Sequence, residues 1–446
     1  MRSTLRLARM APLAAALALG CGGSGGAPGG SPANPTILSG PEERVVTDDG
    51  HLVVHFTRSG ADAAPEQLVE WAREALALGW SELVDRGGWT APPADDGAGG
   101  DDRYDVYLMS FFARGGEQSA NGLTFPGATP ASSYIYVNTD ITPGSDPSKH
   151  PEVIFFTENY VRSVFVHELG HAVQLATNPY QGSDMERFLE ENVAQYHAVE
   201  ALELLSSTLP KDVLVIQTLL SQRMGKPELS LHDRDARRDY VPLWSKYIAE
   251  SRGGDPRLLR RIFETMATGA DALTATDAVL QQTGGDLESD FQTYAEWNYR
   301  IGEHADGTGY AEAARFATLF GSVRVSGALG PAPAQRKSGG DAPRNLGTNY
   351  VRFAPDPATT DGELRFTGQF GVRWAVSVMA FDPELGRYQI ERALVGPVHT
   401  DAAIRIPSWN QRTDLVAVVS NLTRDLSANS SQAGYKLETR GVSIER

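Results

Sequence analysis

Two histidines and a glutamate have the residue types and spacing needed to do chemistry. His167, Glu168 and His171 form an H-E-x-x-H pattern inside an apolar run typical of a helix. Four residues make slightly more than one helical turn, so both imidazoles project from one face and can reach one zinc ion. Glu168 lies close enough to act on a zinc-bound water. The pattern indicates metal-assisted hydrolysis. The alternative is a buried helix whose histidines are only hydrogen-bonded.

A carboxylate further along the chain is expected to complete this site. Glu191 lies twenty positions after His171, and its spacing and its E-x-x-A context both favour it. On a second helix it would supply a third ligand and leave the fourth position of the zinc ion open for water or substrate. Three nearby acids compete with it: Glu190, Glu186 and Asp184.

The same spacing excludes two other kinds of zinc site. An H-E-x-x-H-x-x-G-x-x-H site needs glycine at position 174 and histidine at 177, where this chain has Gln174 and Thr177. A site with a cysteine ligand needs a thiol near the histidines. The single cysteine, Cys21, lies far away near the start of the chain.

The remaining pattern resembles the H-E-x-x-H-x19-E signature of thermolysin-like gluzincins. The residues that carry the resemblance are His167, Glu168, His171 and Glu191. Residues 51–299 as a whole resemble secreted bacterial metalloproteases of this group. One position departs from the pattern, because thermolysin has an aspartate four residues after its glutamate ligand and this chain has Gln195. We therefore expect the outer partner of one histidine to differ.

The resemblance implies a zinc peptidase acting on a peptide or protein substrate. It makes His167, His171 and Glu191 the Zn²⁺ ligands and Glu168 the general base. It also implies an oxyanion donor from a helical half of the domain, with Tyr240 as first candidate, followed by His232 and Tyr247. Two other functions stay open: a catalytically inactive surface-binding or structural lipoprotein on the same scaffold, and a non-proteolytic zinc hydrolase.

Strands and helices in the first half must position these residues. Alternating segments predict strands at 51–57, 103–110 and 133–138, with a helix at 65–86. They suggest a small sheet packed on the helix that carries the histidines, with Tyr134–Asn138 as its exposed edge and residues 115–130 as a cleft rim. His51 and His55 are about 13 Å apart if they lie on a strand, so we interpret them as structural.

The sequence from residue 157 onward predicts the two ligand-bearing helices, further helices and then short strands. The first helix should run from near Thr157 to Asn178-Pro179, and Ser183-x-x-Glu186 resembles a capping box that opens the next. More helices are expected at 212–223, 240–251, 256–266, 271–283 and 287–299, and short strands at 349–353, 363–366, 374–380, 402–406, 415–420 and 434–439. The predicted fold class is α+β, with a zincin-like catalytic domain at 41–316 and an all-β sandwich at 317–446.

The start of the chain reads as a bacterial lipoprotein leader. Residues 1–20 combine a basic start with a short apolar core and end in Ala18-Leu19-Gly20-Cys21, which resembles a lipobox. Cys21 would then be lipidated, and residues 21–40, rich in Gly, Ser, Pro and Ala, would form a flexible tether. The alternative is an ordinary signal peptide with an incidental cysteine. We expect an exported protein held at the cell envelope only by its lipid.

Charge limits the possible partners. The formal net charge is −16, and removing residues 1–20, with three arginines and no acids, makes it −16 − 3 = −19. Such an acidic body is a poor partner for nucleic acid. With Cys21 lipidated no disulfide can form, and no later apolar stretch is long enough to predict a transmembrane helix. The sequence leaves the oligomeric state open.

Overall fold

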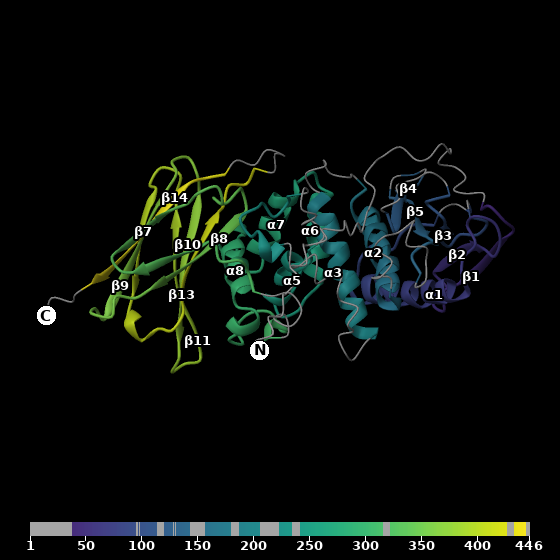
Figure 1. The fold of residues 1–446 in the computed structure, drawn as a ribbon. Helices are drawn as coiled ribbons and strands as arrows, with labels where there is room; N and C mark the ends of the chain where they lie inside the picture. The colour runs from purple at the N-terminus through teal and green to yellow at the C-terminus, as the bar shows by residue number, and fades with distance from the viewer. Residues whose placement is uncertain are drawn as a thin grey trace, which may run out of the picture.

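The fold is α+β, and its elements follow one another along an elongated body (Figure 1). A computed structural model describes residues 38–94, 97, 99–113, 120–127, 129, 131–142, 157–179, 187–205, 223–233, 241–314, 322–425 and 432–442. One end holds a sheet with two helices, the middle is helical, and the other end holds two further sheets. Cys21, Tyr240 and residues 212–222 of the helix predicted at 212–223 lie outside the described residues.

The first sheet has five strands. They are β1 (Glu42–Val46), β2 (Leu52–Thr57), β3 (Tyr104–Met109), β4 (Gly122–Pro126) and β5 (Ser133–Asn138). Their order is β1-β2-β3-β5-β4, with a parallel centre and antiparallel outer pairs. Apolar side chains of the central strands form one core with α1 (Glu66–Trp80) and α2 (Glu158–Thr177), so the sheet supports α2 directly.

The prediction that β5 is the exposed edge was wrong. β5 lies between β3 and β4, and β4 is the outer strand of the described sheet. Residues 122–126, predicted as part of a loop, pair antiparallel with β5, and the Phe125 ring stacks on Tyr134 with centroids 5.8 Å apart. Glycine and proline in the segment hid a strand that depends on pairing and ring contacts with β5.

His51 and His55 make separate structural contacts, as predicted. The exposed His51 ring stacks on Trp80, with centroids 4.4 Å apart. His55 is buried in β2, where its Nδ1 lies 3.0 Å from Glu42 and its Nε2 lies 2.8 Å from Asp105. Burial lowers the pKa of His55, but the hydrogen bonds and charges of Asp105 and Glu42 outweigh it and raise the pKa above its ordinary value.

His55→Gln should therefore destabilise the protein most in acid. The stabilisation from a raised pKa is complete below the unfolded pKa of about 6.5 and is lost as pH rises through the folded pKa. We expect a loss of about 3 kcal/mol in unfolding free energy at pH 6, as for one broken buried ion pair. Denaturant unfolding at pH 6 and pH 9 should show the deficit shrinking at the higher pH. His51→Gln is the matched control, and an equal deficit at both pH values would contradict this role for His55.

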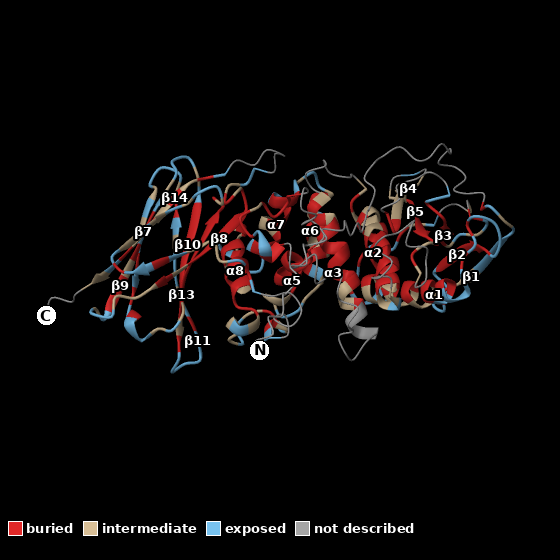
Figure 2. Ribbon diagram, in the orientation of Figure 1, coloured by how far each residue is buried: buried red, intermediate tan, exposed pale blue. Residues whose placement is uncertain are grey.

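Helices form the middle of the molecule. Thr157 caps α2 by accepting a hydrogen bond from the Tyr160 backbone amide at 3.3 Å, and α2 stops just before Asn178-Pro179, as predicted. The later helices are α3 (Arg187–Leu205), α5 (Leu243–Glu250), α6 (Arg257–Met266), α7 (Ala272–Gln281) and α8 (Leu287–Tyr299). Buried residues run through this helical part, so α2 and α3 rest on a continuous core (Figure 2).

Two sheets with a shared apolar core end the chain. The strands are β6 (Gly327–Pro331), β7 (Ala334–Lys337), β8 (Gly347–Ala354), β9 (Asp361–Gly368), β10 (Trp374–Asp382), β11 (Arg387–Val395), β12 (Asp401–Ile406), β13 (Leu415–Asn421) and β14 (Tyr435–Val442). Their orders are β11-β10-β13-β8-β6 and β12-β9-β14-β7. All six predicted strands are present. β6, β7 and β11 were missed because glycine, proline and charged residues interrupt their apolar pattern.

The second half is joined to the helices by buried contacts. Helix α8 packs on β10 and β13, and the Gln292 amide donates to the Ser377 hydroxyl at 2.5 Å. Glu296, fully buried on α8, accepts a hydrogen bond from the Arg392 Nε at 2.7 Å. Removing the Arg392 side chain would leave this carboxylate buried without its cation, so the ion pair helps to hold α8 against the sheet.

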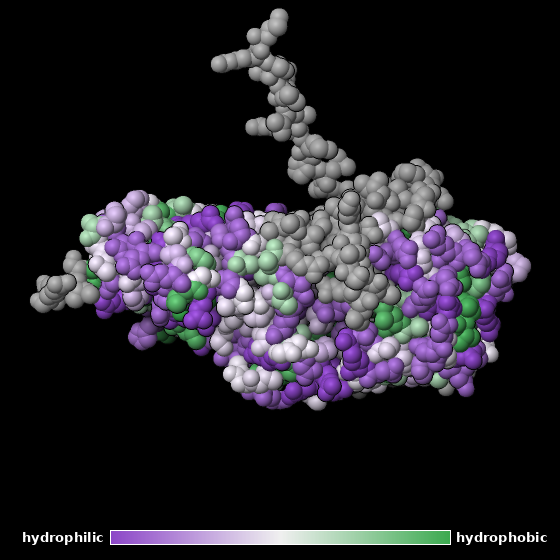
Figure 3. Space-filling view, turned by 90° about the horizontal axis from the view of Figure 1, so that it is seen from below, coloured by the Kyte–Doolittle hydropathy of each residue, from purple (hydrophilic) through white to green (hydrophobic). Residues whose placement is uncertain are grey.

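The described residues on the face seen from below are largely hydrophilic (Figure 3). The hydrophobic residues on this face form small, separated patches. Within the described ranges, no helix is both long and apolar enough to cross a membrane.

Candidate metal centre

The site forms where α2 and α3 pack against each other. At the crossing, a Cβ added to Gly170 would lie 3.2 Å from the Ala194 Cα and 3.3 Å from its Cβ. A larger residue at either position would push the helices apart. Gly170 belongs to the H-E-x-x-H segment and Ala194 to the E-x-x-A segment, so each pattern supplies one half of the close contact as well as ligands.

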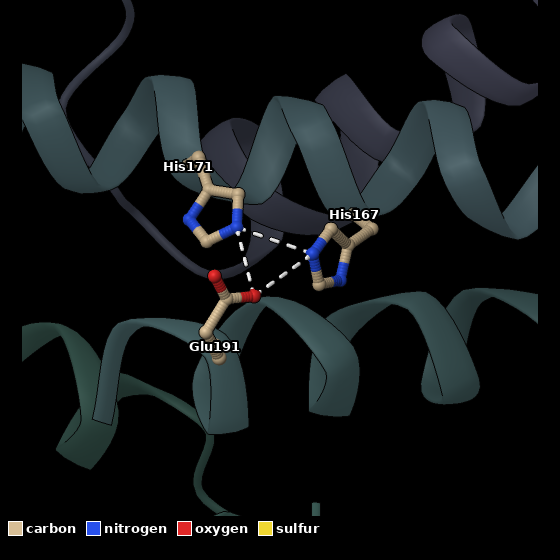
Figure 4. A group of neighbouring side chains, drawn as sticks. All are labelled: His167, His171 and Glu191. Atoms are coloured by element: carbon tan, nitrogen blue, oxygen red, sulfur yellow. Dashed lines mark hydrogen bonds and ion pairs between the residues drawn. The ribbon is translucent and has the colours of Figure 1, made fainter. Parts of the chain in front are cut away.

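Three donor atoms from these helices converge on one point (Figure 4). His167 Nε2 lies 3.1 Å from His171 Nε2, and each of them lies 3.4 Å from Glu191 Oε2. The side chains of His167 and Glu191 are 2% and 1% exposed, whereas His171 is 12% exposed. The group is therefore largely buried, and His171 is its most exposed member. The structure thus brings the side chains of His167, His171 and Glu191 together.

The donor set fits a zinc ion in type and in spacing. Zinc prefers imidazole nitrogen and carboxylate oxygen at about 2.0–2.2 Å, and a tetrahedron with such bonds has edges of about 3.3–3.6 Å. The three separations in the structure, 3.1, 3.4 and 3.4 Å, are close to those edges. Among the residues that the structure describes, this is the one cluster of three or more His, Cys, Asp or Glu side chains suited to a metal ion.

Electrostatics at the cluster favour a positive charge. Burial raises the pKa of the Glu191 carboxyl, but the two histidines outweigh it and hold the pKa far below its usual range. Burial lowers the pKa of His171, and the Glu191 charge outweighs it and raises the pKa above the ordinary value. The negative carboxylate thus stabilises positive charge on the histidine nitrogens. It would stabilise a cation bound between the three atoms in the same way.

Glu168 is held in place by contacts with β4. The Thr124 hydroxyl lies 2.8 Å from Glu168 Oε2 and 2.9 Å from its backbone oxygen. A Cβ on Gly122 would lie 2.5 Å from the Glu168 Cγ, so only glycine leaves room for the side chain there. Burial raises the pKa of Glu168 above its ordinary value, in the direction that a general base near neutral pH needs.

The outer partner of His171 is Gln174. The His171 Nδ1 lies 3.0 Å from the Gln174 Oε1, and the Gln174 Nε2 donates to the Glu190 backbone carbonyl at 3.0 Å. On α3, the Nε of Arg187 lies 3.4 Å from the second carboxylate oxygen of Glu191. Sequence reasoning used Gln174 only to exclude a third histidine and overlooked Arg187, although both lie within one helical turn of a ligand.

The other candidates are placed as follows. Glu190 is not part of the cluster, and Glu186 and Asp184 lie outside the described residues, as does Tyr240. Tyr247 is 1% exposed and its hydroxyl donates to Asp290 at 2.5 Å, so it belongs to the helical core. His232 is buried, with its ring 6.2 Å from that of Phe188 on α3.

Comparison with known proteins gave no match to any protein-family model and no match among curated proteins.

Proposed function

We propose that this protein is a zinc-dependent peptidase of the gluzincin type, with a zincin-like catalytic domain. The observation that carries the proposal is the convergence of His167, His171 and Glu191 at separations close to those of a tetrahedral zinc site. A zinc ion bound there would activate a water molecule and polarise the carbonyl group of the peptide bond. The buried Glu168, held by Thr124, would take the water proton and return it to the leaving amine.

The outer strand β4 supports a peptide as the substrate. The Asn138 amide donates to the Asn121 carbonyl at 2.9 Å and the Gly127 amide donates to the Ser132 carbonyl at 2.7 Å. Because bonding alternates along an antiparallel pair, the backbone groups of residues 122, 124 and 126 point away from β5. Gly122 and Thr124 are also the residues that hold Glu168, so a peptide added to this edge would lie beside the base.

Pro126 limits how long that added strand can be. It has no N–H, so the outward side of β4 offers amide donors at Gly122 and Thr124 only. A short extended segment therefore fits this edge, and a disordered loop or terminus of a protein can supply one.

We place the enzyme at the cell envelope through lipidated Cys21, with no membrane contact beyond that anchor.

A cleavage assay tests the proposal. The purified protein should hydrolyse an unfolded casein-like substrate, lose this activity when a chelator removes its metal, and regain it on addition of stoichiometric Zn²⁺. Cleavage products identified by mass spectrometry would give the side-chain preference. Zinc-loaded protein that cleaves no such substrate would overturn the peptidase assignment and favour the inactive binding lipoprotein or a non-proteolytic hydrolase.

A further inference from the structure

We propose that Gln174 is the positioning residue that sets the tautomer and orientation of His171 for the metal ion. Gln174 would do so through its side-chain hydrogen bond to His171 Nδ1. The inference rests on the metal site within the proposed function, but not on peptide hydrolysis.

The hydrogen bonds of Gln174 fix the direction of its amide group. The Glu190 backbone carbonyl can only accept a hydrogen bond, so the Gln174 amide nitrogen must be the atom facing it, at 3.0 Å. The Gln174 carbonyl oxygen then faces His171, 3.0 Å from Nδ1. A carbonyl oxygen cannot donate, so Nδ1 must carry the proton. In neutral His171 the lone pair is consequently on Nε2, the atom that faces the other two donors.

The same amide connects the two ligand-bearing helices. Gln174 lies on α2, one turn beyond His171, and its bond partner Glu190 directly precedes Glu191 on α3. The side chain is buried, with 4% of the residue exposed, so water competes little for either bond. One residue therefore orients one ligand and links its helix to the backbone beside another.

Position 195 does not show the same role. Gln195 is 2% exposed, and its Oε1 accepts no hydrogen bond from the described residues. A neutral amide at 174 polarises an imidazole less than a carboxylate does, so a carboxylate at 174 should make His171 a stronger ligand. The zinc affinity of a variant with a carboxylate at position 174 therefore distinguishes an effect on His171 from an effect on helix packing.

Zinc affinity of three single variants tests the proposal. Gln174→Met keeps the side-chain volume and removes both hydrogen bonds. Gln174→Glu keeps the acceptor for His171 and removes the donor to Glu190. The control is Gln292→Met on α8, since Gln292 is also a buried glutamine whose amide bridges elements, to Ser377 at 2.5 Å and Val418 at 3.3 Å. Metal-free protein would be titrated with Zn²⁺ against a chromophoric chelator, with circular dichroism checking the fold.

Gln174→Met should weaken zinc binding by about 10–100-fold, the range for loss of an outer partner. Gln174→Glu should bind zinc within about threefold of the wild type or more tightly. Gln292→Met should lower the melting temperature and leave zinc affinity unchanged. The proposal is overturned if Gln174→Met binds zinc like the wild type, or if Gln174→Glu is as weak as Gln174→Met, since the helix link alone would then explain the effect.

The two proposals fail in different ways. Wild-type protein that binds zinc with an affinity that depends on Gln174 but cleaves no peptide would end the peptidase assignment and leave this inference intact. Active enzyme whose zinc affinity does not change when residue 174 is substituted would support the peptidase assignment and end this inference.

Discussion

Glu168→Gln is expected to lower the rate of peptide hydrolysis by about 10²–10⁴-fold while the protein keeps its zinc. The amide has nearly the shape of the carboxylate, so it should still fit against Gly122 and beside Thr124. It cannot accept the water proton, so the step assigned to the base is lost. The measurement is kcat on a defined peptide together with metal content by atomic emission.

The matched control for this variant is Glu158→Gln. Glu158 lies in the first turn of the same helix, its side chain is 50% exposed, and it pairs with Arg162 at 2.8 Å. The same chemical change there should leave both activity and zinc content near those of the wild type. Unchanged turnover in Glu168→Gln would contradict the role of this residue as the base.

Glu191→Gln is expected to weaken zinc binding by more than about a hundredfold, beyond the range for changes in outer partners. The substitution keeps the side-chain size but removes the negative charge that lies 3.4 Å from both histidine nitrogens. Two imidazoles would remain, without the carboxylate that completes the three-ligand set. Zinc competition against a chelator measures the change.

Glu190→Gln serves as its control, because Glu190 is adjacent in sequence and its side chain is not part of the cluster. That variant should bind zinc nearly as the wild type does. If it lost zinc while Glu191→Gln kept it, the ligand would be the neighbouring acid, and the assignment of Glu191 would be wrong.

The ligand-bearing helices could be predicted because their signals are local. Thr157 caps α2, Asn178-Pro179 ends it, and helical periodicity alone places His167 and His171 on one face. Glu191 can reach the two histidines only if the second helix packs closely against the first. The Gly170–Ala194 contact makes this possible, and both residues lie inside the two motifs.

The support of the general base could not be predicted in this way. The sequence of β4 predicts a loop because it contains glycine and proline. The segment forms a strand because it pairs with β5. The contacts of Thr124 and Gly122 with Glu168 join positions more than 40 residues apart, so no local pattern reports them. Gln174 was equally hidden, because its second partner is a backbone carbonyl on another helix.

Anomalous diffraction at the zinc absorption edge, from crystals of the zinc-loaded protein, tests the central claim most directly. We predict one strong peak between α2 and α3, about 2.0–2.2 Å from Nε2 of His167, Nε2 of His171 and a carboxylate oxygen of Glu191. A map with no peak at this point, or with zinc bound by other residues, would contradict the account.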